Sequence, residues 1–244
     1  MPHLFAGTSG FAYASWKPDF YPAKLAAKEF LRYYAGRLNS TEVNYTFRQL
    51  PKLDTLKNWV DATPAEFVFS LKAHMRLTHI MKLKGAESFL EVFFRAIDPL
   101  RSARRLGPIL YQLPPAFKCD VAVLTDFLAL LPADIRHAFE FRHASWLNDE
   151  VYSALEKHGA ALCLAESEKL VVPHVITAPF VYARLRKPDY SEEDRLDIAR
   201  RAAEILSGGR DLFVYFKHEE SPQGAIYAEE LLSRKLNAGA QTTG

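Results

Sequence analysis

The sequence predicts a single α/β domain, a (β/α)8 barrel of the TIM type with eight parallel strands. Short β-branched or aromatic runs alternate eight times with longer amphipathic segments. Several of these runs, such as FVFSL, ILYQL and LFVYF, are almost continuously hydrophobic, which is typical of parallel strands covered on both faces. The length of 244 residues also fits, because barrels of this kind take about 250 residues.

The expected strands are short and spread over the whole chain. They cover Leu4–Gly7, Ser40–Asn44, Phe67–Lys72, Gly107–Gln112, His137–Phe141, Ala161–Glu166, Phe180–Leu185 and Leu212–Lys217. The segment SEKLVVPHVITAP, after the sixth strand, contains two prolines and no helical pattern. We therefore expect a helix in every connection except this one.

Helical segments are recognised by their apolar spacing and by residues that start or stop helices. The apolar face that includes Leu124 and Phe127 follows Asp120, a favourable N-cap. Ser191 precedes three acidic residues, which suit the first turn of a helix, and Gly208-Gly209 ends that helix. Leu231, Leu232 and Leu236 mark the last helix.

Composition indicates a soluble cytoplasmic protein. The net charge of +2 neither demands a nucleic-acid partner nor excludes one. Cys119 and Cys163 are far apart in apolar stretches, so we expect buried free thiols and a reducing compartment. There is no secretory signal pattern and no apolar run near the roughly 18 residues of a membrane span. We expect one domain over residues 1–238 and a loose tail over 239–244.

Polar residues accumulate where seven of the eight predicted strands end. They are Glu42, Asn44, Ser70, Lys72, Gln112, Glu140, Arg142, Glu166, Arg184 and Lys217. Active sites of these barrels lie at the carboxyl ends of the strands, so the pattern predicts a shared polar pocket. The alternative is an internal lattice of salt bridges, such as Glu140–Arg142 and Glu166–Arg184, that plugs the barrel and has no other role.

Aromatic residues and histidines flank these strand ends. Tyr13, Trp16 and Trp146 could stack on a planar or sugar-like ligand, or they could pin their loops to the barrel. His79 follows the third strand and is a candidate for substrate binding. No HxH or HExxH spacing occurs, so we expect neither a metal nor an organic cofactor. Mg²⁺ held by Glu140 and Glu166 is the alternative.

Six segments of the sequence resemble the family called domain of unknown function 72, or YecE-like. They are GTSGFAYASWKPDFYP, STEVNYTFRQLP, FVFSLKAHMRLTH, LGPILYQLPPAF, FEFRHASW and YFKHEESPQGAIYAEEL. The resemblance implies a (β/α)8 barrel and supplies no reaction. The resemblance also implies a set of polar positions that the family shares, which are Glu42, Asn44, Lys72, His79, Gln112, Glu140, Arg142, Trp146 and Arg184. Many relatives have Asp at Glu166 and an Asn pair at Lys217-His218.

The leading hypothesis is an enzyme that acts on a small polar or anionic metabolite by general acid/base chemistry. Hydrolysis, isomerisation and lyase chemistry all fit. The candidate catalytic residues are Glu140, as the principal acid/base, with Glu42, Lys72 and Glu166. The candidate binding residues are Asn44, Gln112, Arg142, Arg184, Lys217, His79, Trp16 and Trp146. A nucleic-acid-binding protein, disfavoured by the near-neutral charge, and a non-catalytic ligand sensor are the alternatives. The sequence does not determine the oligomeric state.

Overall fold

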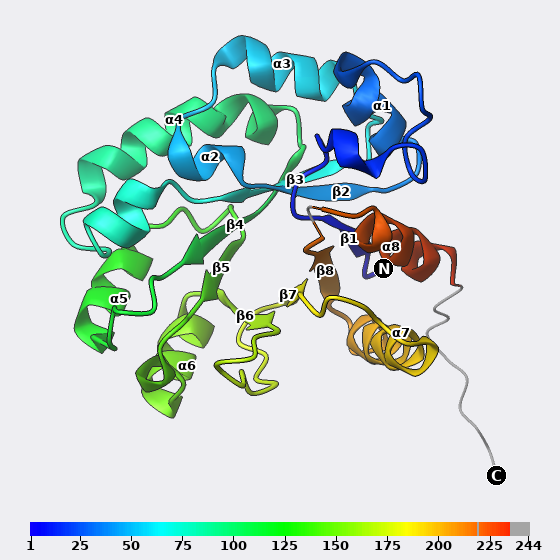
Figure 1. The fold of residues 1–244 in the computed structure, drawn as a ribbon. Coiled ribbons are helices and arrows are strands. Elements are labelled where there is room, and N and C mark those ends of the chain that lie inside the picture. Colours follow the sequence, from blue (N-terminus) through cyan, green and yellow to red (C-terminus); the bar gives the residue numbers. More distant parts are fainter. Residues whose placement is uncertain (219, 235–244) are drawn as a thin grey trace.

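Eight parallel strands curve into a barrel, and the helices lie on its outer side (Figure 1). The computed structural model describes residues 1–218 and 220–234. The strands are β1 (Leu4–Thr8), β2 (Ser40–Val43), β3 (Val68–Lys72), β4 (Leu106–Gln112), β5 (His137–Glu140), β6 (Ala161–Ala165), β7 (Phe180–Leu185) and β8 (Asp211–Phe216). The predicted fold class is confirmed, and every predicted strand is present within one residue at either end.

The barrel is nearly closed, with a seam between β1 and β2. Hydrogen-bonded neighbours follow the order β1-β8-β7-β6-β5-β4-β3-β2, so β1 and β2 form no regular ladder. They meet at a single parallel bridge between Ser9 and Glu42. A Cβ atom on Gly7 would lie 1.8 Å from the carbonyl oxygen of Ser40. Glycine is therefore required for the two strands to approach so closely.

Side chains replace the missing ladder along β1. The N–H of Ala6 donates to Asn39 Oδ1 at 2.9 Å, and Asn39 Nδ2 donates to the carbonyl oxygen of Leu4 at 2.7 Å. The N–H of Thr8 donates to the hydroxyl of Tyr34 at 2.8 Å. These contacts satisfy backbone groups that would otherwise be buried without partners at the seam.

The helices follow the strands in the predicted order. They are α1 (Phe30–Ala35), α2 (Tyr45–Arg48), α3 (Leu53–Asp61), α4 (Glu87–Ser102), α5 (Val121–Ala129), α6 (Asp149–Lys157), α7 (Glu192–Ser207) and α8 (Gln223–Ser233). No helix joins β6 to β7, as the sequence predicts. Asp120 caps α5, and Ser191 forms a capping box with Asp194 on α7. Leu236 and the predicted tail over 239–244 lie outside the described residues.

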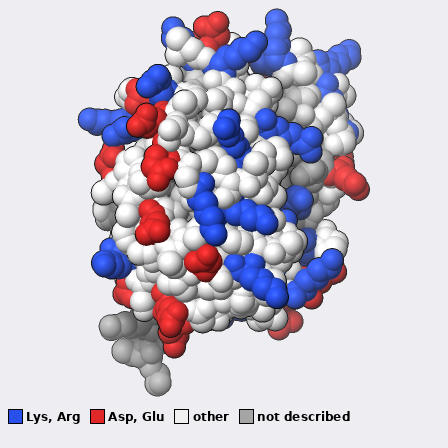
Figure 2. Space-filling model, turned by 90° about the vertical axis from the view of Figure 1, so that its left-hand side faces the viewer, with Lys and Arg blue, Asp and Glu red and all other residues white. Residues whose placement is uncertain are grey.

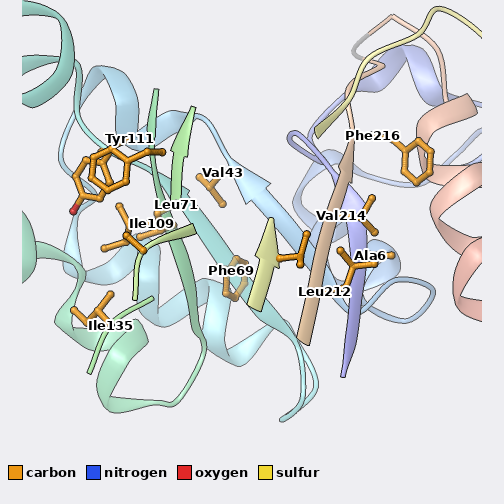
Figure 3. Close-up of a cluster of buried hydrophobic side chains, with 14 of the residues drawn as sticks. Ala6, Val43, Phe69, Leu71, Ile109, Tyr111, Ile135, Leu212, Val214 and Phe216 are labelled. Carbon is orange, nitrogen blue, oxygen red and sulfur yellow. The ribbon is translucent and has the colours of Figure 1, made fainter. Parts of the chain in front are cut away.

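Two apolar clusters build the core, one on each face of the strands. The larger lies between strands and helices and includes Val43, Leu71 and Ile109, which Figure 3 labels. The smaller, with Leu110 and Phe213 among its members, comes from the alternate positions of the strands, which point into the barrel. Both cysteines are free; Cys163 is buried as expected, whereas Cys119 is partly exposed. Among the described residues, the helices are too short or too polar to cross a membrane.

Candidate functional site

The alternation of the strands brings polar side chains into the barrel above the interior apolar cluster. On β7, Tyr182 and Arg184 are two residues apart and therefore point to the same side. Ser40 and Glu42 have the same relation on β2, and Gln112 on β4 is in register with Glu140 on β5. Among the side chains that point into the barrel, the polar ones therefore lie toward the carboxyl ends of the strands.

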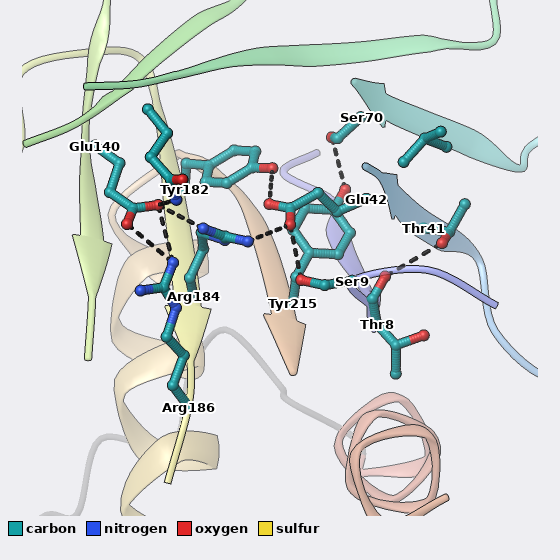
Figure 4. A network of polar contacts seen from close by, with 12 residues as sticks. Thr8, Ser9, Thr41, Glu42, Ser70, Glu140, Tyr182, Arg184, Arg186 and Tyr215 are labelled. Carbon is teal, nitrogen blue, oxygen red and sulfur yellow. Dashed lines mark hydrogen bonds and ion pairs between the residues drawn. The ribbon is translucent and has the colours of Figure 1, made fainter. Parts of the chain in front are cut away.

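Arg184 joins two buried carboxylates at this end of the barrel (Figure 4). Its Nη2 atom donates to Glu42 Oε1 at 2.7 Å, and its Nη1 atom donates to Glu140 Oε2 at 2.5 Å. The three residues have 0–2% exposure and come from β2, β5 and β7. We call Glu42, Glu140 and Arg184 the ionic layer.

The remaining oxygen positions of the two carboxylates are also occupied. Glu42 accepts hydrogen bonds from the Ser9 hydroxyl at 2.7 Å and the Tyr182 hydroxyl at 2.6 Å. In addition to Arg184, Glu140 accepts hydrogen bonds from Gln112 Nε2 at 2.8 Å, Arg142 Nε at 3.1 Å and Arg186 Nη2 at 2.9 Å. Each buried charge is therefore paired and hydrogen-bonded, as burial requires.

These contacts keep Glu140 ionised. Burial alone would raise the pKa of its carboxyl group, but the guanidinium groups of Arg184, Arg186 and Arg142 outweigh burial and hold that pKa well below its usual range. Burial would lower the pKa of Arg184, and the carboxylates of Glu42 and Glu140 raise it instead. An acid held ionised in this way has no proton to donate near neutral pH. The geometry thus gives no support to Glu140 as a general acid.

Lys72, at the end of β3, has a different environment. Its side chain is half-buried, and its Nζ atom lies 4.0 Å from the centre of the Phe47 ring. Within residues 1–218 and 220–234, the amine makes no hydrogen bond or ion pair. Burial, followed by the positive charge of Arg184, lowers its pKa to about 8. Lys72 is thus a basic group that can gain or lose a proton near neutral pH.

His79 lies against the same aromatic ring as Lys72. Its ring centre is 5.0 Å from that of Phe47, and its Nδ1 atom is 2.9 Å from the Thr78 hydroxyl. Burial, Lys72 and Arg142 together lower the pKa of His79, so the imidazole is neutral near pH 7. A neutral imidazole can accept a proton from a bound molecule.

Arg142 and Asn44 also lie at this end of the barrel. Arg142 is 38% exposed and uses its Nε atom to contact Glu140. The Asn44 residue is the N-cap of α2, but its side chain makes no capping hydrogen bond. We call Asn44, Lys72, His79 and Arg142 the outer layer, because each is more exposed than the ionic layer.

Two charged residues predicted for the site, Glu166 and Lys217, do not join these layers. Glu166 accepts hydrogen bonds from the Tyr190 hydroxyl and from the backbone N–H groups of Arg186 and Lys187. It lines a cavity of about 840 Å³ between α7 and the outer face of β6, β7 and β8. Lys217 is exposed just after β8. Of the two ion pairs named in the salt-bridge alternative, Glu140–Arg142 is present. The pair Glu166–Arg184 is wrong, because Arg184 bonds Glu42 and Glu140 instead.

The two tryptophans are packing residues in this structure. Trp16 and Trp146 both have 0% exposure. Trp146 donates from Nε1 to the carbonyl oxygen of Phe117 at 2.6 Å and stacks on Phe141 with ring centres 4.9 Å apart. Of the two interpretations left open by the sequence, this geometry fits loops pinned to the barrel and gives no stacking surface to a ligand.

The donor groups do not match a metal site. Over the described part of the chain, no group of three or more His, Cys, Asp or Glu residues could hold a metal ion. Glu140 and Glu166, the pair considered for Mg²⁺, each have separate partners. The oxygens of Glu140 already face guanidinium groups, which would repel a cation.

Sequence reasoning missed several members of the site. Ser9 and Tyr182 bond Glu42, and Phe47 lies against Lys72. The signal for Tyr182 was present, since it is two residues from Arg184 and so shares its face of β7. Ser9 also had a signal, because it lies at the carboxyl end of the first strand. Phe47 had none, because only the closed barrel brings it against Lys72.

A parallel barrel with its polar residues gathered at one end of the strands defines the class, a TIM-type α/β barrel protein. Residues 5–243 match the family described as "Protein of unknown function DUF72", and the chain belongs to that family. It is 28% identical to the UPF0759 protein YunF of Bacillus subtilis, over 88% of this chain and 89% of YunF. It is 31% identical to the UPF0759 protein YecE of Escherichia coli, over 46% of this chain and 41% of YecE.

Solved structures agree with the fold. A DUF72 family protein from Thermotoga maritima superposes with a TM-score of 0.81 at 28% identity, over 94% of this chain and 98% of that one. An AP endonuclease of family 2 from Brucella melitensis has a TM-score of 0.56 at 12% identity, covering 96% of this chain and 97% of that chain. At such low identity the second likeness concerns the fold alone.

Proposed function

We propose that this protein is an enzyme that moves protons on a small anionic metabolite, with Lys72 as the principal acid/base group. The observation that carries the proposal is the state of the Lys72 amine. It is half-buried, makes no hydrogen bond or ion pair with the described residues, and has a pKa of about 8 although the charges of Glu42 and Glu140 act to raise it. A structural lysine at a strand end is normally exposed or paired. A lysine with a pKa near the working pH is suited to general acid/base catalysis.

The charge around Lys72 supports an anionic substrate. Lys72, Arg142, Arg184 and Arg186 outnumber the carboxylates of Glu42 and Glu140 that they face. Because the carboxylates are bonded to arginine, the positive excess falls on the more exposed side chains of the outer layer. A carboxylate or phosphate group at this position would be stabilised by that excess.

The two layers have different roles in this proposal. The ionic layer is too buried to touch a substrate, so Glu42, Glu140 and Arg184 position the residues above them. Arg142 binds the anionic group, Asn44 orients a hydroxyl or carbonyl group, and His79 acts as a second base. Isomerisation and lyase reactions that begin by removing a proton from carbon fit this set better than hydrolysis does.

An assay of proton exchange with solvent tests this function, and it does not require the product of the enzyme to be known. The protein is incubated in D₂O with pyruvate, 2-oxobutyrate, 2-oxoglutarate or dihydroxyacetone phosphate, and exchange of the C–H protons next to the carbonyl is followed by ¹H NMR. We expect faster exchange for at least one compound, and loss of that acceleration in Lys72→Met. Lys118→Met, which alters an exposed lysine, is the matched control.

Two results would contradict the proposal. One is exchange at the uncatalysed rate for every compound. The other is acceleration that Lys72→Met retains. Saturable binding of a compound without exchange, measured by calorimetry, would support the alternative of a ligand sensor instead.

A second candidate function is nucleic-acid binding. Figure 2 shows Lys and Arg side chains at the top of one face and from its centre to the lower right, whereas most Asp and Glu side chains lie along the left side and the lower part. Such a group of cations could contact phosphate groups. The buried tryptophans, however, leave this candidate without the stacking surfaces it was expected to use. Fluorescence anisotropy with labelled single-stranded DNA at low salt tests it, and the absence of binding would reject it.

A further inference from the structure

We propose that Lys72 is also a nucleophile, which forms an imine with the carbonyl carbon of a 2-oxo carboxylate held by Arg142. This inference rests on the proposed function, because it uses the same site and names the substrate class. It adds a covalent bond between enzyme and substrate, which proton transfer alone does not require.

The other nucleophilic groups of the site are unavailable. The hydroxyl groups of Ser9 and Tyr182 donate to Glu42, and those of Ser40 and Ser70 contact the hydroxyl of Tyr215. The thiol of Cys163 is 1% exposed inside the barrel. Of the groups in the two layers, the Lys72 amine combines exposure to solvent with the absence of a hydrogen-bond partner among the described residues.

The position of the amine is fixed by its surroundings. The hydroxyl of Thr46, on α2, donates to the backbone carbonyl oxygen of Lys72 at 2.7 Å. The next residue of α2, Phe47, supports the amine from one side at 4.0 Å. Contact with the aromatic ring limits the rotamers of the lysine, and the amine makes no hydrogen bond or ion pair with the described residues, which favours attack on a carbonyl carbon.

Arg142 supplies the preference for a carboxylate next to the carbonyl. Its Nε atom bonds Glu140, which fixes the plane of the guanidinium group. Its terminal nitrogens make no hydrogen bond to any residue in the described ranges. A planar guanidinium edge of this kind binds a carboxylate through two parallel hydrogen bonds.

The chemistry is balanced without a bound cofactor. The neutral amine of Lys72 attacks the carbonyl carbon, so that a C–N bond forms and the C=O π bond breaks. The oxygen takes one proton from the amine nitrogen and one from solvent and leaves as water, which gives a protonated imine. The imine then draws in the electron pair of the neighbouring C–H bond as its proton leaves. The neutral imidazole of His79, beside the same phenyl ring, accepts that proton.

Reductive trapping tests the imine directly. The full-length protein is incubated at neutral pH with pyruvate and sodium cyanoborohydride, and its peptides are analysed by mass spectrometry. We expect an adduct on the Lys72 peptide with the mass of pyruvic acid minus one oxygen atom. Hydroxyacetone, a neutral ketone of similar size, should label Lys72 about tenfold less, because it cannot form the charge-assisted contact to Arg142.

Matched variants separate an imine formed in the site from nonspecific labelling of surface lysines. Lys72→Arg keeps the positive charge and should abolish the adduct, whereas Lys118→Arg should retain it. Arg142→Gln should reduce labelling by pyruvate to the level of hydroxyacetone. Circular dichroism of each variant establishes that it is folded.

Defined outcomes overturn the inference. It fails if pyruvate leaves Lys72 unmodified while exposed lysines are labelled at about pH 10, where ordinary lysines lose their protons. It also fails if Lys72 is labelled no faster than other lysines at neutral pH. Loss of proton exchange in Lys72→Met without any trapped adduct would retain the proposed function and reject the imine.

Discussion

Replacement of Glu140 by Gln removes one charge from the centre of the ionic layer. The Glu140 side chain is 2% exposed and accepts hydrogen bonds from Arg184, Arg186, Arg142 and Gln112. Gln has nearly the same shape, so the main effect is electrostatic. It leaves Arg184 with Glu42 as its remaining carboxylate partner.

The expected loss of stability is large. Removing one partner of a buried ion pair costs ~3–5 kcal/mol, since the other charge stays buried without compensation. The side chain is almost fully buried, so screening by solvent does not reduce this figure much. We expect a loss of about 3 kcal/mol in the free energy of unfolding at pH 7, because the retained contact of Arg184 to Glu42 offsets part of the cost.

Urea unfolding followed by circular dichroism measures this loss. Glu204→Gln is the matched control, because it removes a carboxylate from an exposed pair with Arg200. That variant should have nearly the wild-type unfolding midpoint. Both variants keep the volume of the original side chain, so they differ chiefly in the burial of the charge that is lost.

The difference in the free energy of unfolding between wild type and Glu140→Gln should become smaller in acid. The folded-state pKa of Glu140 lies below its ordinary value of 4.5, so its stabilising contribution is complete above about pH 4.5. That contribution is lost as the pH falls from 4.5 toward the folded-state pKa, because only the unfolded chain takes up the proton there. The variant has no such group. A loss of less than about 1 kcal/mol at pH 7, or a gap that stays constant in acid, would refute the reasoning.

Three other predictions concern a strand contact and two bases. Gly7→Ala should destabilise the barrel by roughly 2 kcal/mol or more in urea unfolding, because the new Cβ would overlap the carbonyl oxygen of Ser40; an unchanged midpoint would contradict the seam geometry. Burial lowers the pKa of His137 from 6.5 to about 4, so the unfolded chain binds the extra proton and stability should fall by up to ~3 kcal/mol as the pH drops from 6.5 to 4. His137→Phe should flatten this profile, and an equally steep one would reject the assignment. Lys72→Met should abolish proton exchange. It should also raise the free energy of unfolding by about 2 kcal/mol at pH 7, because burial lowers the pKa of Lys72 from 10.5 to about 8 and the charged amine therefore destabilises the folded state. The stability of the wild-type protein in thermal unfolding should rise from pH 8 to 10.5, because only the unfolded chain keeps the Lys72 proton in this range. A Lys72→Met protein less stable than wild type would contradict the expected cost of burying this charge.

The fold could be predicted from the sequence because the features that indicate it each lie within one short segment. A run such as FVFSL is apolar at almost every position, which a strand covered on both faces explains. Ser191 with Asp194 forms a capping box through atoms three residues apart, and Asp120 caps its helix in the same way. The missing helix after β6 follows from the prolines of that connection. Each of these interactions lies within one segment of the chain.

Alternation along the strands also predicted that Glu42, Glu140 and Arg184 lie at the polar end of the barrel. It was wrong for Glu166, which lines a cavity on the outer face of the strands. Only the tertiary structure decided the states of the residues at the polar end. Glu42, Glu140 and Arg184 come from three different strands, and their closure into one buried layer holds the pKa of Glu140 below its usual range. The same closure leaves the Lys72 amine against Phe47, without a hydrogen bond or ion pair to the described residues. Burial and charge depend on neighbours distant in sequence, and so a pKa cannot be read from a strand alone.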